Sequence, residues 1–257
     1  MYAIDLNSDL GESYGAYRMG MDAEIIPLIS SANVACGFHV GDFNTMAETA
    51  QMCRKSGISI GAHPGFPDLQ GFGRRNMALS PADVQNLIIY QVGALDAFCK
   101  SAGLKLQHVK PHGALYNMAA KSPELSRAIC QGIYAFNPTL ILLGLSGSEM
   151  LRQAREIGLP CAAEVFADRA YEEDGTLVAR SKPGAMITDE DEAVRRVIGM
   201  IRNHRVTSIT GKEIEICPDS VCVHGDSEKA LLFVKKIRAA LEQEGIAILP
   251  LHEILRP

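Results

Sequence analysis

The stretch Asn33-Val-Ala-Cys-Gly-Phe-His39-Val-Gly41 is an apolar run that ends at a histidine and, two residues later, at a glycine. A histidine that follows an apolar segment and precedes a glycine by one or two residues recurs in Ile58-Ser-Ile-Gly-Ala-His63-Pro-Gly65, Val109-Lys-Pro-His112-Gly113 and Val221-Cys-Val-His224-Gly225. Each stretch is typical of a β-strand that ends where a flexible backbone presents an imidazole. In a barrel of alternating strands and helices, chemistry takes place at the carboxyl ends of the strands, so four such ends predict a functional site there.

Strand and helix patterns alternate along most of the chain. The predicted strands are 2–7, 31–36, 58–62, 105–110, 139–144, 160–165 and 219–223, with a further short one at 246–249. Helix starts are indicated by Asp42, Ser80, Ser122 and Thr188, since these residue types cap helices. Repeated strand–helix units in 257 residues predict one domain, residues 1–257, with a parallel sheet closed into a barrel. An open, doubly wound sheet is the alternative.

The alternation within the strands predicts a polar barrel interior. Successive side chains of a strand point to opposite faces, so Asp5, Asn7 and Asp9 share one face while the aliphatic residues between them share the other. His108, Lys110 and His112 form a second set, and Ser220, Cys222 and His224 form a third. Because a barrel of this type is usually filled with branched aliphatic side chains, polar ones predict a site that reaches inside.

Composition excludes several classes of function. The formal net charge is −5 and the basic residues are scattered, which disfavours a nucleic-acid surface. The N-terminus has neither a basic segment nor a long apolar segment for export, and no apolar run reaches the ~18 residues of a membrane span. Seven cysteines without a C-x-x-C pair favour a reducing, cytoplasmic setting. Whether the chain forms a homo-oligomer stays open.

An acidic run and the histidines are the candidate chemical groups. Asp5, Asp9 and Glu12 fall within eight residues, and Asp5 lies inside the apolar part of its strand, where a carboxylate must be paired or shift its pKa. Imidazole together with carboxylate suits zinc or a similar ion, and a metal, if bound, would be held by Asp9, His39 and His63. The chain has no H-E-x-x-H motif, so the histidines also fit a structural role or metal-free catalysis.

Lys110 is predicted to lie on the polar face and therefore needs an anionic partner. The candidates are Asp5, Glu164 and a substrate carboxylate. Two long loops, 63–79 and 166–187, carry further charged residues, among them Arg169 and Lys182. Loops of this length are often lids or binding loops, although mobile surface connections are equally consistent. The sequence has no G-x-x-x-x-G-K-[ST] motif and so no recognisable ATP-binding loop.

These motifs resemble those of the LamB/YcsF family. The matching segments are Asp5-Leu-Asn-Ser-Asp-Leu-Gly-Glu12, Asn33-Val-Ala-Cys-Gly-Phe-His-Val-Gly-Asp42, Gly61-Ala-His-Pro-Gly-Phe-Pro-Asp68, Val109-Lys-Pro-His-Gly-Ala-Leu-Tyr-Asn117, Glu164-Val-Phe-Ala-Asp-Arg-Ala-Tyr171 and Cys222-Val-His-Gly-Asp226. They follow one another over almost the whole chain, which makes the resemblance specific.

The resemblance implies an irregular seven-stranded β/α barrel like that of polysaccharide deacetylases, which share the glycoside hydrolase/deacetylase fold. It also implies a hydrolase of a cyclic amide, the ATP-dependent 5-oxoprolinase, which converts 5-oxo-L-proline (pyroglutamate) to L-glutamate. The resemblance further implies two partner subunits, B and C, which supply the phosphorylation step. ATP is then a co-substrate of the complex, in agreement with the missing ATP-binding loop.

The expected roles follow from that reaction. Asp5, Asp9 or Glu164 is expected to act as general base, and His39, His63 or His112 to stabilise the oxyanion or protonate the leaving nitrogen. The residues expected to bind substrate are Asn7, Lys110, Arg169, Lys182 and His224. Two alternatives stay open: a metal-dependent, deacetylase-like hydrolase of a sugar or other small amide, and a non-catalytic organising subunit.

Overall fold

Seven parallel strands form the centre of the structure, a computed structural model that describes residues 2–224 and 228–255. They pair in the order β1-β2-β3-β4-β5-β6-β9, and β9 also pairs with β1, which closes the sheet into a barrel. Their bounds are Ala3–Leu10 (β1), Ser31–Ala35 (β2), Ser59–His63 (β3), Leu106–Val109 (β4), Ile141–Leu145 (β5), Cys161–Phe166 (β6) and Ser220–Cys222 (β9). The predicted barrel is confirmed.

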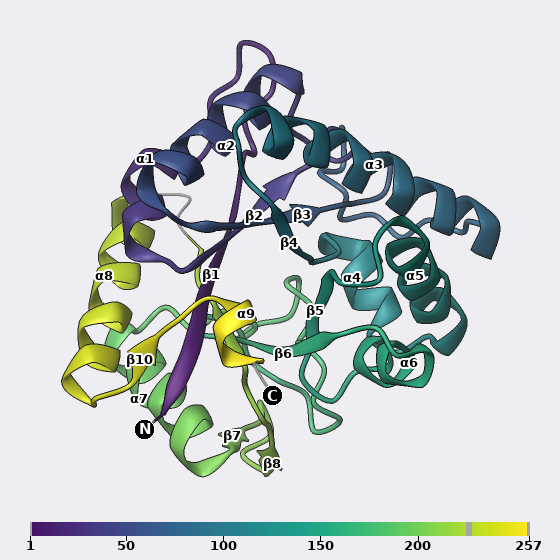
Figure 1. Cartoon of the computed structure of the whole chain (residues 1–257). Helices are drawn as coiled ribbons and strands as arrows, with labels where there is room; N and C mark the ends of the chain where they lie inside the picture. The colour runs from purple at the N-terminus through teal and green to yellow at the C-terminus, as the bar shows by residue number, and fades with distance from the viewer. Residues whose placement is uncertain (1, 225–227, 256–257) are drawn as a thin grey trace.

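Helices surround the strands as an outer layer (Figure 1). The longer ones are α2 (Phe43–Ser56), α3 (Pro81–Ser101), α5 (Pro123–Phe136), α6 (Glu149–Ile157), α7 (Glu190–Asn203) and α8 (Glu228–Gln243). Shorter ones are α1 (Asp22–Ile25), the 3-10 helix η1 (Ile26–Leu28), α4 (Gly113–Ala119) and α9 (Leu251–Ile254). Within the described ranges, no helix combines the length and the apolar character needed to cross a membrane.

Three of the four predicted helix starts are confirmed by their hydrogen bonds. The side chains of Asp42, Ser80 and Ser122 each accept a bond from the backbone N–H three residues further on, which satisfies a donor that the first turn leaves unpaired. The cap of α7 is Asp189, one residue after the predicted Thr188. Both Thr and Asp suit the position, so the pattern indicates the helix better than its first residue.

The two faces of the barrel strands differ as predicted. Ile4 and Leu6 of β1 are fully buried and belong to the apolar core between the barrel and its helices. Asp5 and Asn7, which alternate with them, are equally buried but bond to polar side chains of neighbouring strands inside the barrel. The structure therefore has an apolar layer outside the sheet and a polar interior within it.

The last described segment closes the amino-terminal end of the barrel. Strand β10 (Ala247–Ile248) pairs with the start of β1, and α9 follows it, with Leu251 fully buried against Ile141, Leu143 and Ala162. An antiparallel pair, β7 (Arg205–Thr207) and β8 (Glu213–Glu215), was not predicted from the sequence. Its strands have three residues each and are mostly exposed, so they lack a hydrophobic pattern.

Candidate active site

The predicted strand ends meet at one end of the barrel. His63 is the last residue of β3, His39 follows β2, and His112 precedes the first turn of α4. Glu12 follows β1, and His224 lies two residues beyond β9. Parallel strands of a closed barrel place their carboxyl ends on the same rim, which is why residues as far apart in the chain as Glu12 and His224 belong to one region.

A buried lysine joins two carboxylates in this region. Nζ of Lys110 lies 2.9 Å from Oδ1 of Asp9 and 2.7 Å from Oε1 of Glu164. Burial opposes charge on the lysine, but Asp9 and Glu164 outweigh it and hold the pKa of the ammonium well above its usual value. Burial would likewise raise the pKa of Asp9, yet His63 and Lys110 hold it well below its usual range. Asp9 is therefore an ionised carboxylate.

Asp5 lies deeper in the barrel and has a different environment. Its carboxylate accepts hydrogen bonds from the hydroxyls of Ser30, Ser31 and Ser220. Burial raises the pKa of this carboxyl to about 6, although the serine hydroxyls lower it. Of the anionic partners considered for Lys110, Glu164 is in contact with it and Asp5 is not. Asp9 is the second carboxylate that contacts Lys110.

Amide and imidazole groups lie beside Asp9 in the barrel interior. Asn33 of β2 donates from Nδ2 to Oδ1 of Asn7 and to Oδ1 of Asp9, both at 2.8 Å. Its own Oδ1 lies 2.7 Å from Nε2 of His108. Burial, with Lys110 nearby, lowers the pKa of His108 to about 3, so this imidazole is neutral and donates to the amide. These contacts orient Asp9.

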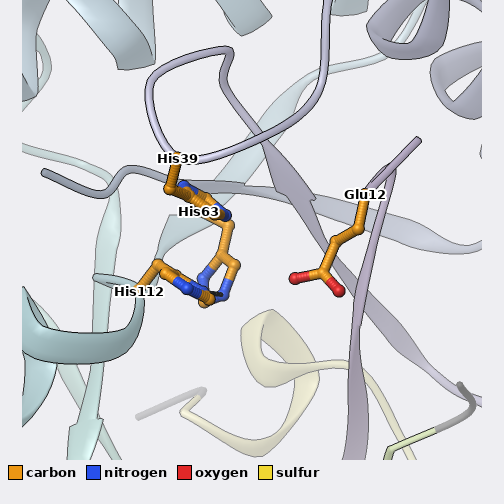
Figure 2. Close-up of side chains that lie close together, drawn as sticks. All are labelled: Glu12, His39, His63 and His112. Carbon is orange, nitrogen blue, oxygen red and sulfur yellow. Dashed lines mark hydrogen bonds between the residues drawn. The ribbon is translucent and has the colours of Figure 1, made fainter. Parts of the chain in front are cut away.

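The imidazoles of His39, His63 and His112 pack together at the carboxyl ends of the strands (Figure 2). Nε2 of His63 lies 2.9 Å from Nδ1 of His112 and 3.4 Å from Oδ2 of Asp9. The His39 ring stacks on that of His112, with centroids 3.7 Å apart. Burial and the neighbouring His63 lower the pKa of His112 to about 3, and burial and His112 lower that of His39 well below its usual value.

A cavity of about 340 Å³ opens beside these residues. Asp9, Glu12, His63, Lys110 and His112 line it together with Tyr116, Phe166 and Arg169, and the two exposed arginines Arg74 and Arg180 complete its mouth. Its size lies in the range of small-molecule sites, roughly 300–1,000 Å³. Cationic groups at the entrance suit an anionic ligand.

His224 also lines the cavity and is paired with Asp168. Its Nδ1 lies 2.8 Å from Oδ2 of that aspartate. Burial disfavours the charged imidazole, but Asp168 outweighs this effect and raises the pKa of His224. Phe166 packs 6.3 Å from the His224 ring, centroid to centroid. His224 is thus the histidine of this site best suited to carry a positive charge.

The structure does not gather every residue expected to bind substrate. Lys182 is exposed and pairs with Glu172 at 2.8 Å, outside the cavity lining. Arg180, two residues earlier, lines the cavity in its place. Arg169 is buried at the cavity wall and donates to the carbonyl oxygen of Val178 at 2.6 Å. Asn7 lies beneath the cavity, bonded to Ser220 and Asn33.

Two residues of the site carry no expectation from the sequence. Tyr116 donates its hydroxyl to Oε2 of Glu164 at 2.7 Å, and Asn33 connects Asn7, Asp9 and His108. The sequence nevertheless contains a feature that indicates each residue, a helical spacing for Tyr116 and a strand parity for Asn33. Tyr116 lies one helical turn after His112, so the two share a helix face, and Asn33 has the parity of an inward residue on β2.

Fold and site together define a β/α-barrel protein with ionised and neutral polar groups assembled at the carboxyl ends of its strands. The chain belongs to the LamB/YcsF family, whose model matches residues 4–256. Its barrel also superimposes on a deacetylase with substrate, at a TM-score of 0.50 and 15% identity over 98% of this chain and 90% of that one, a likeness of fold alone.

The similar proteins include curated relatives of the same length. One from Clostridium beijerinckii, named as the A subunit of 5-oxoprolinase, is 63% identical over 99% of this chain and 100% of that protein. The protein of the same name from Campylobacter jejuni is 55% identical over the same shares. A solved structure, the lactam utilization protein from Thermus thermophilus, has a TM-score of 0.91 and 47% identity and covers 96% of this chain and 99% of its own.

Proposed function

We propose that this chain is the A subunit of a 5-oxoprolinase that hydrolyses 5-oxo-L-proline to L-glutamate with cleavage of ATP, acting with B and C subunits. The observation that carries the proposal is the full-length identity of 63% to a relative named as the A subunit of this enzyme. A cavity of small-molecule size, lined by Asp9 and His112, supports a role in the chemistry itself. The seven free cysteines fit a cytoplasmic complex.

The reaction sets clear demands on the site. Water must add to the lactam carbonyl, the C–N bond must break, and the nitrogen must take a proton to become the amino group of glutamate. A lactam amide is unreactive, so its carbonyl oxygen must be stabilised as negative charge develops. We assign ATP cleavage to the whole complex, where phosphorylation of the carbonyl oxygen would serve this purpose.

The described groups can be assigned to these demands. Asp9, which is ionised and beside His63, is our candidate for orienting and deprotonating the water. His224, charged through its pair with Asp168, is our candidate for protonating the leaving nitrogen. Arg74 and Arg180 at the cavity mouth suit the substrate carboxylate. Lys110 is already in contact with Asp9 and Glu164, so we assign it the task of holding Asp9 in place.

The test is glutamate release from 5-oxoproline and ATP by purified chain with its B and C subunits. The full complex should turn over, whereas the chain alone should not. Asp9→Asn should lower turnover by at least about 100-fold, because a general base contributes roughly 10²–10⁴. His112→Ala should also lower turnover strongly, because the His112 ring contacts His63, which lies 3.4 Å from Asp9. His252→Ala, an exposed histidine on α9 at the other end of the barrel, is the matched control.

Full turnover by the Asp9 and His112 variants would refute the catalytic assignment and favour an organising subunit. Absence of turnover by the wild-type complex, with B and C shown to be active on their own, would refute the 5-oxoprolinase assignment. Release of acetate from an N-acetylated sugar by the chain alone would favour a deacetylase-like amide hydrolase instead.

A further inference from the structure

The hydrogen bonds of His63 and His112 leave two nitrogens facing each other. Nδ1 of His63 lies 2.7 Å from the carbonyl oxygen of Lys110, and Nε2 of His112 lies 2.8 Å from that of Phe72. A carbonyl oxygen only accepts, so both of these nitrogens carry the proton. When both imidazoles are neutral, each has one N–H, so the remaining lone pairs, on Nε2 of His63 and Nδ1 of His112, point at each other across 2.9 Å unless a proton or a metal ion lies between them.

Two facing lone pairs at this distance need a cation between or beside them. Nitrogen ligands lie about 2.0–2.1 Å from a bound zinc-type ion, which brings two of them to about 3 Å from each other. Metal-bound histidines also usually donate their other N–H to a carbonyl or carboxylate, which fixes the ring. His63 and His112 both show this arrangement, with backbone carbonyls as the partners.

His39 provides an independent observation. Its side chain is fully buried, yet neither ring nitrogen has a hydrogen-bond partner among the residues that the structure describes. A buried polar group without a partner is costly, and such groups call for a ligand or a catalytic role. Two glycines hold the ring in place: a Cβ at Gly65 would lie 2.6 Å from Nδ1 of His39, and one at Gly73 2.7 Å from its Cβ.

Glu12 supplies the fourth group. Figure 2 shows its side chain extending from the end of β1 with the carboxylate directed toward the three imidazoles. One donor atom from each of Glu12, His39, His63 and His112 lies within 4.8 Å of the others. Asp9, Cys222 and His224 form a second such group, but Nζ of Lys110 already lies 2.9 Å from Asp9 and 3.3 Å from the cysteine sulfur. An ammonium thus supplies the positive charge there.

We propose that Glu12, His39, His63 and His112 bind one divalent transition-metal ion of the zinc type. Three imidazoles and a carboxylate are a ligand set that zinc and its neighbours prefer over magnesium or calcium. The site differs from the predicted set of Asp9, His39 and His63 in its carboxylate. Oδ1 of Asp9 is paired with Lys110 and its Oδ2 lies 3.4 Å from Nε2 of His63, whereas Glu12 groups with all three imidazoles. Such an ion can polarise a carbonyl group next to the cavity. The inference concerns binding and stands independently of the proposed substrate.

The test uses the purified full chain, treated with a chelator and dialysed. Zn²⁺ binding is followed by titration calorimetry, and Co²⁺ binding by visible absorption bands, which report nitrogen and oxygen ligation directly. The wild type should bind one equivalent of either ion. His39→Ala should lower the affinity by at least about 100-fold and change the Co²⁺ spectrum, because one of four ligands is lost. His252→Ala should bind like the wild type.

Glu12→Gln provides a second variant, since Glu12 is partly exposed and the substitution keeps its shape. It should weaken Zn²⁺ binding at least about tenfold with unchanged circular dichroism. The proposal is overturned if the wild type binds no stoichiometric metal, or if both variants bind as tightly as the wild type. Either result would mean that the His63–His112 contact holds a proton. Neither depends on 5-oxoproline, ATP or the other subunits.

Discussion

At the scale of single residues, two aspartates in the polar interior of the barrel lie in different electrostatic environments. Asp9 is next to a lysine and stays ionised, whereas Asp5 is surrounded by serine hydroxyls. The sequence places both on one face of β1 because an even number of positions separates them on an extended strand. Only the neighbouring strands decide which of them has a cationic partner.

The environment of Asp5 predicts a specific pH dependence of stability. Burial raises the pKa of its carboxyl from 3.8 to about 6 in the folded protein. Between these values the folded state keeps a proton that the unfolded chain has released, so the free energy of unfolding falls as pH rises. The stabilisation is present below about pH 4 and lost above about pH 6, and its size is on the order of 3 kcal/mol.

Asp5→Asn removes this titration. Relative to the wild type, the variant's free energy of unfolding should therefore increase by about 2 kcal/mol between about pH 4 and pH 7, because part of the full effect has already occurred at pH 4. Urea unfolding at the two pH values measures the difference and cancels the titration of other groups, such as Asp9. Parallel stability curves for the two proteins would contradict a raised pKa for Asp5.

At the scale of elements, the loop between β3 and α3 positions the histidines as much as the strands do. Gly73 has a φ of 63°, a left-handed conformation that favours glycine. A Cβ there would lie 2.7 Å from Cβ of His39 and 2.9 Å from Cδ2 of His112. The sequence indicates this loop by its glycines and prolines, but not that its backbone packs against two imidazoles.

Gly73→Ala is accordingly expected to displace the imidazoles and to reduce glutamate release by the complex by at least about tenfold. Gly158→Ala is the matched control, because Gly158 has a φ of 74° but nothing within 4 Å of the added Cβ. Gly158→Ala should lose about 1 kcal/mol of stability through backbone strain, and Gly73→Ala should lose more, because its Cβ also clashes with the two imidazole side chains. Equal activity of the two would show that the Gly73 contact has no functional consequence.

At the scale of the whole molecule, the two ends of the described chain meet at the amino-terminal end of the barrel. There β10 pairs with β1 (Figure 1), and Leu251 of α9 packs against Ile141, Leu143 and Ala162 and closes this end of the barrel. The site lies at the carboxyl ends of the strands, which is the opposite end. This separation lets one end maintain the fold and the other carry strained and charged groups. It also predicts that substitutions at the amino-terminal end of the barrel, where β10 and α9 lie, change stability rather than catalysis.

Leu251→Ala should lower the free energy of unfolding by about 2–5 kcal/mol, since it leaves a cavity among Ile141, Leu143 and Ala162. Turnover of the folded complex should change less than about twofold. Glu253→Ala, an exposed neighbour on the same helix, should be neutral in both respects. Chemical denaturation and glutamate release measure the two effects. A large loss of turnover with unchanged stability would contradict the prediction that the amino-terminal end of the barrel affects stability alone.

Much of this architecture was predictable because it depends on local patterns. Strand positions, helix caps and the inward parity of Asp5, Asn7, Lys110 and His112 follow from periodicity and turn chemistry within a few residues. Of the three partners that the sequence left open for Lys110, Glu164 is one that contacts it. The pair β7–β8 was missed because its short, exposed strands have no periodic signal.

The contacts within the site were decided by the tertiary structure. Lys110 binds Asp9 rather than Asp5, and Glu12 lies beside the three imidazoles. His39 has no hydrogen-bond partner among the described residues. These contacts arise because barrel closure and strand register set the height of each side chain along the barrel axis. The sequence determined which residues face inward and that their strands form a barrel. Which of them touch depends on distances between strands far apart in the chain, and no local pattern encodes those distances.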